Sequence, residues 1–215
     1  MWFAGPARRV PEHGRPEALR LGLALAPGMR VGLYGGSFNP VHDGHLQVAR
    51  TAKVRLGLDR VIWLVTPGNP LKEAPAGLTA RVAAVRARVA DPSMIVSDLE
   101  TRTGTRYILD TLRALRARYP GVHFVWIMGA DNLAGFHRWR GWAEIMRQVP
   151  VAVVARPGAM LAALSSPTAR RFAYARVPAN KAARLPLMAP PAWVFLPTPL
   201  NFASSTALRS RGLVG

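Results

Sequence analysis

The chain has 215 residues, of which half are apolar, and a formal net charge of +18. It contains no cysteine, which excludes disulfides, thiol catalysis and zinc held by cysteine. No uninterrupted apolar run approaches the length of a membrane span, so we expect a cytoplasmic protein that does not enter a membrane. The charge suits phosphorylated partners. The basic residues are spread along the chain without the interleaved aromatics typical of RNA recognition, so nucleic acid is not favoured.

Residues 1–29 contain four prolines and several arginines. This composition predicts a loosely ordered extension ahead of a single domain that spans residues 30–215. The sequence shows no internal repeat and no second domain. It leaves open whether the chain forms a homo-oligomer.

The first motif lies at residues 31–45. Val31–Tyr34 is an apolar run that predicts a strand, and it meets two glycines, Gly35 and Gly36. Because glycine lacks a Cβ atom, an anion can approach its backbone N–H group closely. An apolar pattern of helical spacing begins at Gly44. A glycine turn that leads into a helix start is a ready site for an anion.

Two histidines in this motif, His42 and His45, are three residues apart. At a helix start this spacing lets both rings lean toward one point. Imidazole N–H groups aimed at a phosphate would stabilise charge that develops there. The alternative is that one histidine caps the helix and the other lies on the surface. We favour the phosphate interpretation because the pair directly follows the glycine turn.

Further apolar runs alternate with helical patterns, which predicts an α/β doubly wound parallel sheet. A helix is expected from Thr79, as its cap, through Ala90, and residues 159–191 are expected to form short helices and loops. The remaining strands are predicted at Val61–Val65, Met94–Val96, Val122–Met128, Val151–Val154 and Trp193–Leu196.

Asp131 follows the predicted strand at Val122–Met128. In open parallel sheets, ligands lie beyond the carboxyl ends of the strands, where an aspartate can accept hydrogen bonds from a ribose or an adenine. The alternative role for Asp131 is a helix N-cap.

A second motif near the end of the chain combines hydroxyl side chains with an arginine. Hydroxyl groups at a helix start present side-chain and backbone donors together, and the arginine one turn later can fork onto phosphate oxygens. An ordinary capped helix is the alternative. The motif consists of Ser204, Ser205, Thr206 and Arg209.

Together these motifs resemble the HxGH nucleotidyltransferases, and the form Gly-Gly-Ser-Phe-Asn-Pro-Val-His-Asp-Gly-His at 35–45 looks most like the bacterial nicotinate mononucleotide adenylyltransferases. The resemblance covers about residues 30–211. It implies a Rossmann-like fold and the transfer of AMP from ATP to nicotinate mononucleotide, with loss of pyrophosphate, in NAD biosynthesis. It also implies Mg²⁺ carried on the ATP phosphates, without a protein metal site.

The resemblance also implies roles for single residues. His42 and His45 would be catalytic. Contacts to ATP and its phosphates would come from Gly35, Gly36, Ser37, Lys72, Gly129, Asp131, Ser204, Ser205, Thr206 and Arg209. The mononucleotide would be bound by Phe38, Thr105, Arg106, Tyr107, Ile108 and Trp139. Two positions depart from the family pattern: Asn39 replaces the usual acid, and Ile108 stands where many members have threonine.

Three alternative functions remain open at this point, as does one alternative for a single residue. The acceptor could be another phosphorylated molecule, such as nicotinamide mononucleotide or phosphopantetheine. The chain could be a basic nucleic-acid-binding protein, or a fragment of an aminoacyl-tRNA synthetase. Trp139 could be a core residue and not a binding residue.

Overall fold

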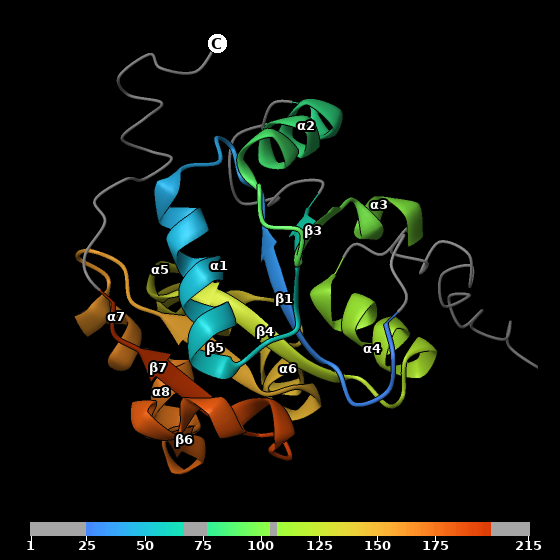
Figure 1. Ribbon diagram of the computed structural model, residues 1–215. Helices are drawn as coiled ribbons and strands as arrows, with labels where there is room; N and C mark the ends of the chain where they lie inside the picture. The colour runs from blue at the N-terminus through green and yellow to red at the C-terminus, as the bar shows by residue number, and fades with distance from the viewer. Residues whose placement is uncertain (1–24, 67–76, 104–106, 199–215) are drawn as a thin grey trace, which may run out of the picture.

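The computed structural model describes residues 25–66, 77–103 and 107–198. Within these ranges, seven parallel strands form a sheet in the order β3-β2-β1-β4-β5-β7-β6 (Figure 1). The predicted α/β doubly wound parallel sheet is therefore confirmed. The strands are β1 (Arg30–Gly36), β2 (Arg60–Val65), β3 (Met94–Ser97), β4 (His123–Gly129), β5 (Val151–Val154), β6 (Arg176–Val177) and β7 (Trp193–Leu196).

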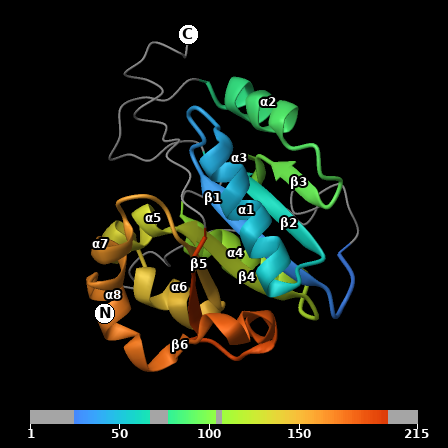
Figure 2. The same cartoon turned by 60° about the vertical axis from the view of Figure 1, so that its left-hand side comes forward.

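Helices cover both faces of this sheet, and Figure 2 shows α1 lying along the strands on one of them. That face is covered by α1 (Asp43–Leu56), α2 (Leu78–Arg88) and the 3-10 helix η3 (Ala179–Leu187). The opposite face is covered by α3 (Leu99–Thr103), α4 (Ile108–Arg118), α5 (Ala130–Gly135), α6 (Trp142–Gln148), α7 (Met160–Leu164) and α8 (Pro167–Arg171). Two more 3-10 turns are η1 (Phe136–Arg138) and η2 (Ala173–Ala175).

Two apolar cores lie between the sheet and its helices. In β2, Ile62 and Leu64 pack into the core under α4, whereas Trp63 and Val65 pack into the core under α1. Neighbouring strand residues point to opposite faces, so a strand that is covered on both sides must be apolar throughout. This explains why the central strands could be read from continuous apolar runs.

The first strand is longer than the sequence suggested. It continues through Gly35 and Gly36, which pair with Leu64 and Val65 of β2. A Cβ atom at Gly35 would overlap the buried ring of Trp126, and one at Gly36 would lie 2.9 Å from the Phe38 ring. The glycines therefore make room for aromatic rings, and the strand does not end at them as predicted.

Other boundaries also differ from the predictions. The N-cap of α2 is Gly77, and Thr79 lies in the first turn of the helix, so the predicted cap is wrong; the helix ends at Arg88, not Ala90. Residues 159–191 form short helices, as expected, but strand β6 was missed because it has two residues. Residues 25–29 pack with the domain: Leu25 is buried and the N–H of Gly28 donates to the carbonyl of Gly121 at 2.7 Å.

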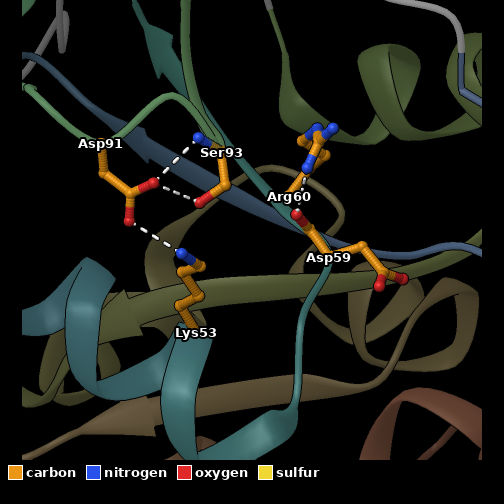
Figure 3. Close-up of polar contacts among 5 residues, drawn as sticks. All are labelled: Lys53, Asp59, Arg60, Asp91 and Ser93. Atoms are coloured by element: carbon orange, nitrogen blue, oxygen red, sulfur yellow. Dashed lines mark hydrogen bonds and ion pairs between the residues drawn. The ribbon is translucent and has the colours of Figure 1, made fainter.

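A polar contact holds the far end of α1 against the loop before β3 (Figure 3). Lys53 Nζ lies 2.8 Å from Asp91 Oδ2, and Asp91 Oδ1 accepts hydrogen bonds from the backbone N–H and the hydroxyl of Ser93. The hydrogen bonds from Lys53 and Ser93 hold the pKa of Asp91 well below its usual range. The helix that begins with the two histidines is thus fixed at its other end as well.

Candidate active site

The polar residues of the site gather at the carboxyl ends of three neighbouring strands. His42 follows β1, Asp131 follows β4 and Arg156 follows β5. Strands β1 and β4 are adjacent, and the chain continues from them toward opposite edges of the sheet. This is a topological switch point, where open α/β sheets bind their ligands.

Both histidines take part in capping helix α1. His42 is the N-cap, and its Nδ1 accepts a hydrogen bond from the N–H of Gly44 at 3.1 Å. His45 reaches back, and its Nδ1 accepts from the N–H of His42 at 3.2 Å. This reciprocal arrangement is a capping box made with imidazoles. The two rings lie 3.8 Å apart between centroids. The structure therefore combines the helix cap with the close approach of the two rings.

The capping bonds decide where the imidazole protons lie. An Nδ1 atom that accepts a hydrogen bond carries no proton, so the neutral ring must be protonated on Nε2. Burial, with a smaller effect of the nearby Arg156, lowers the pKa of His42 from 6.5 to about 4. At neutral pH, His42 is thus a neutral ring that presents an Nε2–H donor on the side away from the helix.

Arg156 meets this donor. Its Nη2 lies 3.4 Å from Nε2 of His42, and its Nη1 lies 3.7 Å from Asp131 Oδ2. A guanidinium can only donate, so it cannot satisfy a protonated Nε2. Two donors held side by side can bind a common acceptor, and a phosphate oxygen has the required chemistry.

Arg156 has no role among the residues assigned from the sequence. Only the fold shows that Arg156 contacts His42. A signal was present nonetheless. An arginine two residues beyond a buried parallel strand falls at the ligand edge of the sheet.

Asp131 does not cap its helix. The N-cap of α5 is Gly129 and no side chain caps it, so the N-cap alternative for Asp131 is wrong. The Asp131 side chain is half exposed beside Arg156. A Cβ atom at Gly129 would lie 2.8 Å from Arg156 Cδ, so glycine lets the arginine cross the strand end. The ligand role of Asp131 and Gly129 stays a prediction.

The turn after β1 presents its backbone and not its aromatic side chain. Phe38 is only 2% exposed and its ring packs 5.1 Å from that of His45. Its φ of 46° lies in the left-handed region, which is strained for a bulky residue. Any contact of Phe38 with a ligand must therefore come largely from its main chain. Ser37, the residue before it, is half-buried.

Two segments assigned to the mononucleotide lie against each other. The guanidinium carbon of Arg140 sits 4.3 Å from the centre of the Tyr107 ring, and a Cβ atom at Gly141 would lie 2.7 Å from Leu109 Cδ2. The start of α4, which includes Ile108, is thus next to the turn that carries Trp139. Trp139 is half-buried and its ring lies 5.1 Å from that of Phe136. This adjacency is compatible with the predicted pocket.

Seven of the assigned residues lie outside the described residues, so their roles remain predictions. They are Lys72, Thr105, Arg106, Ser204, Ser205, Thr206 and Arg209.

Among the described residues, no group of three or more histidine, aspartate or glutamate side chains is placed to hold a metal ion. In the same part of the chain, no helix combines the length and the apolar content needed to cross a bilayer.

Glu100, on α3, is a buried carboxyl group that sequence reasoning missed. Burial raises its pKa from 4.5 to about 7. The folded state therefore binds more protons than the unfolded state between these values, and stability falls as pH rises through that window. We expect Glu100→Gln to raise the free energy of unfolding at pH 8 by up to the order of 3 kcal/mol, and the melting temperature should rise with it. At pH 4.5 the melting temperature should be nearly unchanged. Melting curves of both proteins across this range measure the effect; a variant with the wild-type pH dependence would contradict it.

Known proteins are similar to this chain. The profile of the cytidylyltransferase-like family matches residues 33–211. A probable nicotinate-nucleotide adenylyltransferase of Caulobacter sp. (strain K31) is 64% identical over 87% of this chain and 100% of its own length. One from Methylorubrum extorquens is 56% identical over 85% of this chain and 100% of its own.

A solved structure shares the fold. Nicotinic acid mononucleotide adenylyltransferase of Plasmodium falciparum, complexed with NaAD, superposes with a TM-score of 0.64 at 14% identity, over 85% of this chain and 83% of that one. The family profile and the parallel α/β sheet place the chain among the nucleotidyltransferases of the cytidylyltransferase-like class. Within that class, the chain belongs to the nicotinate-nucleotide adenylyltransferase family.

Proposed function

We propose that this protein transfers AMP from ATP to nicotinate mononucleotide, which gives nicotinate adenine dinucleotide and pyrophosphate in NAD biosynthesis. The observation that carries the proposal is the pair of donors formed by Nε2 of His42 and Nη2 of Arg156, 3.4 Å apart at the switch point. The pair suits the α-phosphate of ATP. The choice of acceptor is supported by the names of relatives that are 56–64% identical to this chain.

The chemistry needs no general base from the protein. The nucleophile is a phosphate monoester whose second pKa is about 6, so it is already ionised at neutral pH. Catalysis is then a matter of alignment and of stabilising charge on the reacting phosphate. His42, His45 and Arg156 supply donors that are oriented in advance by the capping box and by the end of β5.

Mg²⁺ enters as part of the substrate, MgATP. Asp131, the carboxylate that follows β4 at the ligand edge of the sheet, is paired with Arg156, and the described residues offer no cluster of ligands for a resident ion. Mg²⁺ usually keeps several waters and binds through substrate phosphates. The hydroxyl groups of Ser204, Ser205 and Thr206 and the guanidinium of Arg209 would hold the departing pyrophosphate.

Positive charge near Tyr107 favours an acceptor whose pyridine ring carries a carboxylate. Arg140 lies over the ring of Tyr107, the residue before Ile108, which has no hydroxyl group. A carboxylate on the pyridine ring would be attracted by this cation and by the N-terminal end of α4, whereas a neutral amide would gain less.

Release of pyrophosphate from ATP tests the reaction. It should be measured in parallel with nicotinate mononucleotide, nicotinamide mononucleotide and phosphopantetheine. We expect the first acceptor to give the highest kcat/KM. Faster turnover of another acceptor would reassign the substrate, and retention of RNA without any turnover would support a nucleic-acid-binding protein instead.

Trp139 is expected to stack on the pyridinium ring, an interaction worth about 0.5–2 kcal/mol. Trp139→Ala should therefore raise KM for the mononucleotide far more than KM for ATP. Trp142→Ala is a matched control, because Trp142 packs edge-on against Phe172 in the core. Steady-state kinetics and thermal melting should be measured for both variants. If Trp139→Ala lowers the melting temperature and leaves the mononucleotide KM unchanged, Trp139 is a core residue.

A further inference from the structure

Arg81 is a charged side chain in the core, on helix α2. It is 3% exposed, although its neighbours on the same face, Val82 and Val85, are apolar. Lysine and arginine are almost never buried to this extent without partners that compensate for the loss of water. Its contacts therefore indicate what the side chain is for.

The guanidinium joins two strand ends. Arg81 Nη1 donates to the carbonyl of Ser37, just after β1, at 2.7 Å, and to the carbonyl of Thr66, just after β2, at 2.8 Å. These ends also meet directly, since the N–H of Thr66 donates to the carbonyl of Gly36 at 3.0 Å. One nitrogen atom thus fixes both carbonyl groups at the edge of the sheet where the histidines lie.

The contact with Ser37 also orients the next peptide group. The bond between Ser37 and Phe38 is trans, so the carbonyl of Ser37 and the N–H of Phe38 point in opposite directions. Because Arg81 draws the carbonyl toward α2, the N–H of Phe38 faces away from α2. Phe38 has the strained φ of 46°, and such a conformation persists only where the surroundings hold it.

We propose that Arg81 is a positioning residue, which holds the Ser37–Phe38 peptide so that its N–H is presented to the mononucleotide. The proposal rests on the proposed function for the identity of that ligand. Arg81 lies on the opposite side of this peptide from the presented N–H and acts through the turn. The Phe38 ring packs against His45, so the turn that Arg81 holds is in contact with helix α1.

Two substitutions test the role. Arg81→Ala removes the guanidinium, and Arg81→Lys keeps a charge but replaces the planar fork by a point donor. We expect both to raise KM for the mononucleotide by about tenfold or more, the loss of a well-oriented hydrogen bond, with a smaller change in KM for ATP. Added guanidinium ion, well below denaturing concentrations, should restore part of the activity of Arg81→Ala.

Two control variants on α2 separate positioning from stability. Arg86→Ala removes an exposed charge, and Val85→Ala loosens the buried face of the same helix. Val85→Ala should lower the melting temperature without changing the mononucleotide KM or responding to guanidinium. If Arg81→Lys and Arg81→Ala behave like Val85→Ala in all three measurements, the proposal is wrong.

A readout without turnover keeps this test independent of the reaction. The ring proton resonances of His45 depend on the Phe38 ring, which lies 5.1 Å away and nearly perpendicular. They should shift in Arg81→Lys and stay at their wild-type positions in Val85→Ala and Arg86→Ala. Wild-type protein that uses no mononucleotide would refute the proposed function, whereas unchanged His45 resonances in Arg81→Lys would refute the role of Arg81.

Discussion

Replacing His45 by glutamine should lower kcat by a factor of about 10² or more while the protein keeps its stability. A lost donor to the charge that develops at the reacting centre has an effect of this size. Glutamine at the third helical position can still reach back to the backbone N–H of the N-cap, as His45 Nδ1 does in the structure. His45→Gln therefore removes the imidazole and retains the cap.

Comparison with His45→Ala separates the two roles of the ring. Alanine loses the cap as well, so it should lower kcat to a similar extent and also reduce the melting temperature. His123→Gln, at the start of β4, is the matched control and should leave kcat unchanged. Near-normal turnover in His45→Gln, measured by pyrophosphate release, would exclude His45 from catalysis.

Arg156→Lys is expected to reduce kcat/KM by about 10²-fold, because one ammonium cannot replace the forked contact of a guanidinium. His42→Asn should have a comparable effect and still fold, since asparagine is among the best N-cap residues. If both side chains bind the same phosphate, the double variant should lose less than the two single effects combined, with a coupling energy of about 0.5–3 kcal/mol.

The double-mutant cycle can also contradict the shared phosphate site. Effects of His42→Asn and Arg156→Lys that simply add would mean that the two groups do not share a ligand. Arg147→Lys, on the exposed side of α6, controls for a general effect of exchanging arginine for lysine and should be without consequence.

The strands were predictable because a sheet covered on both faces makes its strands continuously apolar. The histidine motif was predictable because the residues lie close in sequence, and the capping box is a local structure. Arg156 and Arg81 act across the fold: they contact His42 and Ser37, which are 114 and 44 residues away in the chain. Patterns in a single sequence describe local periodicity, so they do not predict contacts between residues that are far apart in the chain.

The reason for the glycines was also beyond sequence patterns. The sequence predicts an open approach for an anion at Gly35, but the Cβ position of Gly35 is taken by the ring of Trp126. Trp126 is on β4, the neighbour of β1 in the sheet. The space left by a glycine can accommodate either a ligand or a packed ring. Which of the two occupies it depends on the neighbouring strand.

During synthesis on a ribosome, β1 emerges long before β4, one of the two strands that flank it in the sheet. A nascent chain that ends at Thr103 contains β1, β2 and β3, but β4, which pairs with β1 along Arg30–Tyr34, has not yet been made. Helix α1 also packs against β4, β5 and β7, so the helix that carries the histidines has only part of its supporting surface. An open strand edge invites pairing with other chains. Truncated products that stop before Trp193 should therefore be prone to aggregation and without activity, and helix α1 becomes fully supported only when nearly the whole chain has been translated.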